Sequence, residues 1–217
     1  MNNKVKRITM IGMFAAIAFA IVVIARIPVV LFLKYDPKDI VITLGGFIMG
    51  PVSALLISVI VSLIEMITIS DTGYIGFIMN VLSTCSFACV ATLIYRRKKT
   101  IVSAVCGLVA GCIAMVITML LWNYLITPLY MKITREAVAE MLLPVFLPFN
   151  LLKGGLNAGF TFLLYKPIVT ALRRSGLITA GSSGEAAGQS KHIGFKVVAL
   201  VVIAACVLWA LSLKGII

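Results

Sequence analysis

Six strongly polar side chains interrupt the long apolar stretches of this chain: Glu65, Asn80, Asn123, Asn150, Lys153 and Asn157. An amide offers both a hydrogen-bond donor and an acceptor, whereas an ammonium offers donors only. Such groups are costly in an apolar interior, and they usually face a cavity or a partner. Together they have the chemistry needed to hold the polar edge of a small ligand.

Three of these residues, Asn150, Lys153 and Asn157, have helical spacing. At about 100° per residue, Lys153 and Asn157 fall within about 60° of Asn150, so the three share one helix face. Four aromatic residues are predicted to wall the same space: Tyr35, Trp122, Tyr124 and Phe149. The alternative interpretation is that the Asn side chains join neighbouring helices by hydrogen bonds, with no ligand involved.

The composition defines the class of protein in which these residues lie. The 217 residues are 62% hydrophobic and only 12% charged, whereas soluble domains are about 45–50% apolar and about 25% charged. A soluble enzyme, a nucleic-acid-binding domain and a disordered tail are therefore excluded. The net charge of +12 fits the cytoplasmic loops of a membrane protein, which collect Lys and Arg. The runs are continuously apolar, so we expect an all-α polytopic protein embedded in a lipid bilayer.

The apolar runs predict six membrane helices within a single domain, residues 1–174: 8–27, 39–50, 52–69, 74–95, 101–126 and 141–172. The second is about a dozen residues, or about 18 Å, which is short of a bilayer core. Asp39 is expected to cap its start. The segment 28–38 is predicted to be a loop, and the segment 127–140 is predicted to be a polar, amphipathic connection.

The C-terminal part differs from the rest. Residues 175–194 are rich in Gly, Ser and Ala and are predicted to form a flexible linker. Residues 195–217 contain a further apolar run, which is long enough for a seventh transmembrane helix.

Basic residues predict the orientation, because cytoplasmic loops are enriched in Lys and Arg. With a cytoplasmic N-terminus, most of these residues lie inside, including those of 4–7, 96–99 and 173–174. The polar residues then fall in the outer halves of their helices, with Asn157 near mid-membrane. We therefore expect a site that opens to the outside.

Other chemistries have weak support. The five cysteines lie in apolar stretches, and buried small hydrophobes are favoured over a metal site or disulfides. Asp36 and Asp39 resemble a divalent-metal pair only weakly, so loop and capping roles are favoured. The chain contains no G-x-S-x-G, H-E-x-x-H or phosphate-binding loop motif, and we expect neither an enzyme nor a cofactor.

A row of small residues marks the first helix. Gly12, Ala16 and Ala20 recur at every fourth position, a spacing that lets another helix approach closely. The second helix could belong to a partner subunit or to this same chain.

Several segments resemble the S components of energy-coupling-factor (ECF) vitamin transporters, and the riboflavin-specific ones most of all. The first is Lys34–Ile40 followed by Gly45–Pro51, and the second is Pro148–Gly154 followed by Phe162–Lys166. The resemblance covers about residues 8–174. The linker and the last apolar run lie beyond the six helices of that family.

The resemblance implies a six-helix substrate-binding subunit without its own ATPase. Such a subunit joins the transmembrane subunit EcfT and two ABC-type ATPases, and topples in the membrane to release its vitamin inward. Asn150 and Lys153 match the flavin-contacting residues of that family, and Asn123 matches an Asn on helix five. The Ala16-x-x-x-Ala20 row matches the family motif that contacts EcfT.

The chemistry of the residues agrees with riboflavin as the transported ligand. Riboflavin is uncharged, and its pyrimidine edge alternates acceptor, donor and acceptor groups, which Asn amides and Lys153 can match. The carboxylates of biotin or folate would favour arginine. Thiamine, a cation, would favour a carboxylate, and Glu65 keeps that alternative open. A stand-alone carrier or a membrane enzyme is the competing class.

Overall fold

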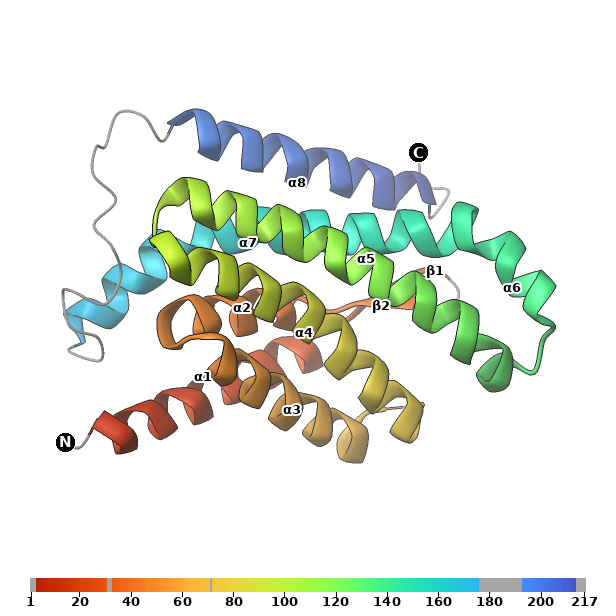
Figure 1. Ribbon diagram of the computed structural model, residues 1–217, viewed down its shortest axis with the longest axis horizontal. Helices are drawn as coiled ribbons and strands as arrows, with labels where there is room; N and C mark the ends of the chain where they lie inside the picture. The colour runs from red at the N-terminus through yellow and green to blue at the C-terminus, as the bar shows by residue number, and fades with distance from the viewer. Residues whose placement is uncertain (1–2, 31–32, 71, 176–192, 214–217) are drawn as a thin grey trace.

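The computed structural model describes residues 3–30, 33–70, 72–175 and 193–213 (Figure 1). Helices make up most of this part of the chain: α1 (Asn3–Ala25), α2 (Lys38–Met49), α3 (Pro51–Thr68), α4 (Gly73–Lys98), α5 (Ile101–Met131), α6 (Arg135–Met141), a π-helical segment η1 (Leu142–Phe146), α7 (Leu147–Arg174) and α8 (Ile193–Leu213). Two short strands, β1 (Ile27–Val30) and β2 (Leu33–Tyr35), lie between α1 and α2.

The all-α membrane architecture predicted from composition is confirmed. Within the described residues, five segments are long and apolar enough to cross a membrane: Lys4–Ala25, Pro51–Thr68, Gly73–Lys98, Ile101–Met131 and Arg135–Leu172. The seventh apolar run forms α8, whose apolar stretch Val197–Trp209 is shorter. Most of the predicted linker, residues 176–192, and the last residues, 214–217, lie outside the described residues.

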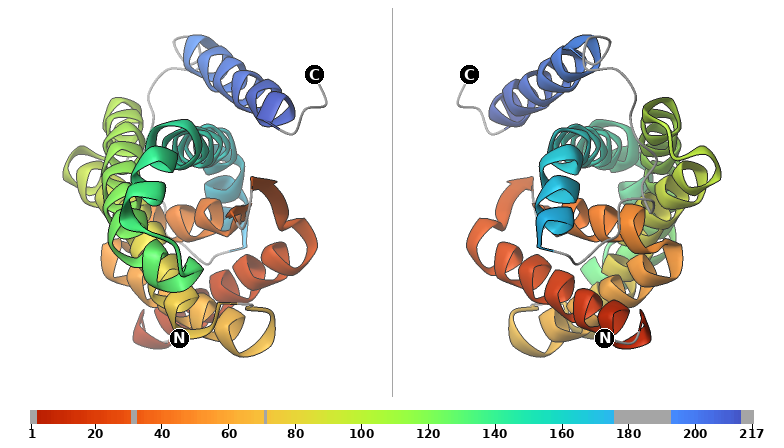
Figure 2. Two further views of the ribbon diagram at one scale, coloured as in Figure 1. Left: turned by 90° about the vertical axis from the view of Figure 1, so that its right-hand side faces the viewer. Right: turned by 90° about the vertical axis from the view of Figure 1, so that its left-hand side faces the viewer.

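The helix α2 lies inside the bundle, enclosed by its neighbours (Figures 1 and 2). Its 12 residues are too short to span a bilayer, and Lys38 to Phe47 are all buried. Gly50 ends it at φ +100°, a conformation that favours glycine, and Pro51 then begins α3. This tight turn folds α3 back along α2.

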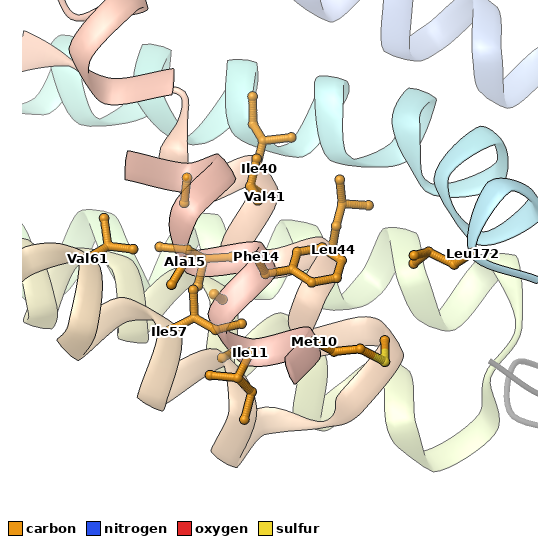
Figure 3. Packing of buried hydrophobic residues seen from close by; sticks show 14 residues of the cluster. Met10, Ile11, Phe14, Ala15, Ile40, Val41, Leu44, Ile57, Val61 and Leu172 are labelled. Carbon is orange, nitrogen blue, oxygen red and sulfur yellow. The ribbon is translucent and has the colours of Figure 1, made fainter. Parts of the chain in front are cut away.

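The packing around α2 is apolar. Side chains of α1, α2 and α3 interdigitate in one cluster, which includes Phe14, Leu44 and Ile57 (Figure 3). The other long pair, α4 and α5, approaches closely at Gly107 and Gly111. A Cβ atom at these positions would lie 2.6 Å and 2.5 Å from backbone oxygens of α4. The helix α7 covers the remaining side of α2.

Two predicted connections contain regular structure. The strands β1 and β2 pair antiparallel as a hairpin, with Ile27 opposite Tyr35 and Pro28 opposite Lys34, where the prediction was a loop. The β-branched residues of Ile27–Val30 favour an extended strand, and Pro28 is tolerated because this strand lies at an edge. The connection predicted at 127–140 is shorter in the structure, because α5 continues through Pro128 to Met131 and α6 begins at Arg135.

The turn into α7 is set by two prolines. Pro148 has no N–H to pair with the carbonyl of Pro144 four residues earlier. The chain forms a π turn there, in which the N–H of Leu147 donates to the carbonyl of Leu142. This turn leads directly into the residues that were predicted to bind a ligand.

Candidate ligand-binding site

A cavity of about 290 Å³ lies at the end of the bundle where α4 and α7 begin and α1 and α5 end. This volume is at the lower end of the range of small-molecule sites, about 300–1,000 Å³. Residues of the hairpin and its flanks form one wall, and α4, α5 and α7 form the others. The polar side chains that line it are Arg26, Lys34, Asp36, Thr72, Asn80, Ser83, Asn123, Tyr130, Asn150 and Lys153.

Three asparagines from three different helices reach this cavity: Asn80 on α4, Asn123 on α5 and Asn150 on α7. Asn123 and Asn150 each donate one amide hydrogen bond to the carbonyl one turn earlier in their own helix, at 2.7 Å and 2.8 Å. Asn123 Oδ1 also accepts a hydrogen bond from Thr127 Oγ1 at 3.0 Å. Since an amide has two N–H donors and an oxygen that can accept two hydrogen bonds, each amide retains further capacity for a ligand. The local hydrogen bonds fix the orientation of each amide before any ligand arrives.

Lys153 lines the cavity one turn beyond Asn150, and its ammonium forms an ion pair with Asp39. The Nζ lies 3.2 Å from Asp39 Oδ2 and also donates to Ser83 Oγ at 3.3 Å. Asp39 in turn accepts hydrogen bonds from Thr84 at 2.6 Å and Asn157 at 3.1 Å. The buried carboxylate of Asp39 is therefore the centre of a network that joins α2, α4 and α7.

The predicted capping role of Asp39 is wrong. The helix α2 begins at Lys38, with Pro37 in the cap position, so Asp39 lies within the first turn and points into the bundle. Asp39 is fully buried, and a carboxylate in such a place requires cations and donors around it. The structure supplies both.

A second ion-pair group adjoins the first one. Lys38, next to Asp39 in sequence, lies 2.5 Å from Glu65 Oε1 and 3.8 Å from Asp36 Oδ2. Asp36 also pairs with Arg26 at 3.2 Å, and Glu65 accepts a hydrogen bond from Asn80 at 3.2 Å. Glu65 thus holds one of the cavity amides in place.

Tyr35 and Asn157 lie beside the Asp39 network and are not among the described residues that line the cavity. The Tyr35 hydroxyl donates to Asn157 Oδ1 at 3.2 Å. Burial raises the pKa of the Tyr35 phenol, and the nearby carboxylates of Asp39 and Asp36 raise it further, so the hydroxyl stays protonated and can donate. Both residues support the site from behind.

The aromatic walls differ in part from the prediction. Phe149 lines the cavity, together with Tyr130, whereas Trp122 and Tyr124 are not among its described lining residues. Trp122 packs instead against a buried cluster that includes Met115 and Met119. Tyr124 is 39% exposed, on the outside of the bundle.

Sequence reasoning missed Lys38 and Ser83, and it assigned Asp39 to another role. The sequence does contain a signal for Lys38, because a Lys and an Asp adjoin one another at the start of a helix that is otherwise apolar. Ser83 carries no such signal, because a lone serine in a membrane helix is common. In the described part of the chain, no group of three His, Cys, Asp or Glu residues is placed to hold a metal ion.

Comparisons with known proteins address the identity of this bundle. The family model for the "ECF transporter, substrate-specific component" matches residues 6–165, about three quarters of the chain. The chain belongs to this family. It is the substrate-binding S component of an ECF-type importer, a subunit of a transporter rather than an enzyme.

Two relatives agree with this assignment. The S component is 29% identical over 178 residues to the "Riboflavin transporter RibU" of Staphylococcus aureus (strain TCH60), an alignment that covers 78% of this chain and 93% of that protein. A solved structure described as "Structure and mechanism of the S component of a bacterial ECF transporter" matches with a TM-score of 0.67 and 29% identity. That match covers 79% of this chain and all of the other. The helix α8 lies beyond the residues matched by the family model.

Proposed function

We propose that this S component captures riboflavin in the cavity at the hairpin end of the bundle. The observation that carries the proposal is that Asn80, Asn123, Asn150 and Lys153 line one cavity with Phe149 beside them. Amides and an ammonium match the alternating acceptors and donors of the flavin edge, and the aromatic ring can cover the flat ring system. The sequence similarity to a riboflavin transporter supports the same ligand.

The charges around the cavity favour a neutral ligand. Lys153 is paired with Asp39, and Arg26 is paired with Asp36. A carboxylate-bearing vitamin would require a cation that is free to pair with it. These two cations already have carboxylate partners within the protein.

The same pairing weakens the thiamine alternative. A cationic ligand would need the carboxylate of Glu65, and that group is held by Lys38 and Asn80 behind the cavity wall. Binding thiamine there would require breaking a buried ion pair, which costs several kcal/mol.

We further propose that the protein lies in the bacterial plasma membrane with its N-terminus in the cytoplasm. This orientation follows from the distribution of Lys and Arg. It places the hairpin, the start of α4 and the start of α7 on the external side, so the cavity opens to the outside. Riboflavin would then be captured from the external medium.

The partner surface that we propose is the face of α1 that carries Gly12, Ala16 and Ala20. All three are exposed, and a Cβ atom added at Gly12 would meet nothing within 4 Å. The opposite face of α1, with Ala18 and Val22, is fully buried. A helix of EcfT can therefore approach this face closely, and the two ABC ATPases would act through EcfT.

The ligand is tested by titrating the purified full chain with riboflavin and with thiamine. The fluorescence of riboflavin should be quenched when it binds the protein at submicromolar concentration. The purified protein should also carry a flavin absorbance spectrum. Binding of thiamine without riboflavin would overturn the ligand and leave the family assignment intact.

The partner surface is tested with Ala16→Trp. The indole ring should block the approach of a partner helix, so ATP-driven riboflavin uptake should be lost while the purified subunit binds riboflavin normally. Ile17→Trp, at an exposed position next to the row, is the matched control. Loss of binding in the isolated subunit would mean that the row packs within the chain, and uptake in cells without EcfT would favour a stand-alone carrier.

A further inference from the structure

The helix α8 lies alongside α7 (Figures 1 and 2), and it packs against two glycines of α7. A Cβ atom at Gly155 would lie 2.8 Å from Cys206 Sγ, and one at Gly159 would lie 2.7 Å from Ile203 Cγ1. Real Cβ atoms do not approach other atoms this closely, so the two glycines form a groove that α8 fills. In a membrane, where apolar burial gives little driving force, such close packing is what holds helices together.

The same face of α8 also reaches the hairpin. Ile203 and Cys206 pack against a buried cluster formed by Tyr35 of β2 with Leu152 and Leu156 of α7. Val29 of β1 packs against this cluster as well. Thus α8 contacts both the fixed helix α7 and the strands that precede α2.

The hairpin depends on packing against its neighbours because it is small, and Leu33 and Val29 also contact a second buried cluster around Phe146. Its strands have four and three residues, and an isolated two-stranded hairpin is marginal at best. Leu33 and Lys34 of β2 line the cavity, so any outward movement of the hairpin opens the cavity wall. The packing of the strands against their neighbours decides how often that movement occurs.

We propose that α8 is a strap that holds the β1–β2 hairpin over the ligand cavity and slows the exit of the ligand. Ile203 and Cys206 are its positioning residues, because each touches both the α7 groove and the cluster under the hairpin; Ile203, which has the larger apolar side chain, is the one tested. The effect on hairpin opening is independent of the ligand, whereas the effect on ligand exit rests on the proposed function.

The test compares two full-length variants of α8 that each remove the same number of carbon atoms. Ile203→Ala empties the contact with the hairpin cluster, and Leu208→Ala does the same on the outer face, where Leu208 is 59% exposed. Amide hydrogen exchange of residues 27–35 is measured first, without ligand. We expect exchange about 5- to 30-fold faster in Ile203→Ala and unchanged in Leu208→Ala, with unaltered exchange in α3 of both variants.

The second measurement is the rate of riboflavin release after rapid dilution, followed by its fluorescence. Release should accelerate by a similar factor in Ile203→Ala only. Faster hairpin exchange in a protein that does not bind riboflavin would overturn the ligand and retain the strap.

The third measurement uses Gly159→Leu, which forces α8 away from α7 without altering α8 itself. It should reproduce the behaviour of Ile203→Ala. Unchanged hairpin exchange in both Ile203→Ala and Gly159→Leu would overturn the proposal.

Discussion

The two ends of the bundle are built from the same helices and differ in what lies between them. At the hairpin end, α4, α5 and α7 leave a cavity of about 290 Å³ lined by amides. At the other end, the space is filled by Phe47, Tyr95 and Tyr165. The ring of Phe47 stacks on that of Tyr95, with 4.5 Å between the ring centroids. The cavity that adjoins these rings measures only about 30 Å³.

The difference separates a polar end, which can hold a ligand, from an end where aromatic rings pack against one another. A ligand in the cavity at the hairpin end would lie beside the ion pair of Lys153 and Asp39. The polar end should therefore govern binding, and the aromatic end should govern stability alone.

The largest expected effect comes from Asp39→Ala, which breaks the network at its centre. The substitution leaves the buried ammonium of Lys153 without its carboxylate, and removing one partner of a buried pair costs about 3–5 kcal/mol. We expect a strongly lowered thermal midpoint of the purified protein and loss of riboflavin binding.

The matched control removes both charges of that pair. Asp39→Asn combined with Lys153→Met should recover most of the thermal stability, because no unpaired charge remains, while riboflavin affinity stays low. If Asp39→Ala alone proved as stable as the parent protein, the ion pair would contribute nothing to the stability of the fold.

The next-largest expected effect distinguishes a residue that lines the cavity from a residue that lies behind it. Asn150→Ala removes a cavity amide and should weaken riboflavin binding by about 1–3 kcal/mol, or roughly 5- to 150-fold, with little change in the thermal midpoint. Asn157→Ala, which lies behind the cavity and holds Tyr35 and Asp39, should lower the midpoint more and the affinity less. Titration and thermal unfolding of both variants test this; the reverse pattern would move the ligand contacts to Asn157.

The smallest effect belongs to the aromatic end. Tyr165→Phe removes the hydrogen bond between the hydroxyls of Tyr95 and Tyr165 and keeps the ring. The loss should cost about 0.5–1.5 kcal/mol of stability and leave the riboflavin affinity unchanged. A clear change of affinity in this variant would mean that the two ends are coupled.

Much of the cavity lining could be predicted from the sequence, because the hydropathy indicates which polar residues lie within apolar helices. Asn80, Asn123, Asn150 and Lys153 are conspicuous there, and the helical period correctly placed Asn150 and Lys153 on one face. Asn157 shares that face but lies one turn deeper, where another helix fills the space.

The other features of the cavity and its surroundings could not be predicted from residue spacing. Asp39 was interpreted as a cap because Asp favours helix starts, and only the three-dimensional packing brings Lys153 from a position 114 residues later to within 3.2 Å of it. The hairpin was missed because Pro28 weakens the signal of the first strand. The rotation of α5, and with it the direction of Trp122, follows from the glycine contacts with α4.

The ion-pair network also has an electrical consequence. Its three cations, Arg26, Lys38 and Lys153, face three carboxylates, Asp36, Asp39 and Glu65, so these six groups sum to zero. Each elementary charge carried across a membrane involves about 2.3 kcal/mol of work per 100 mV. If the subunit turns with a neutral vitamin inside, moving these six groups together would transfer no net charge, and the membrane potential would neither drive nor oppose their displacement.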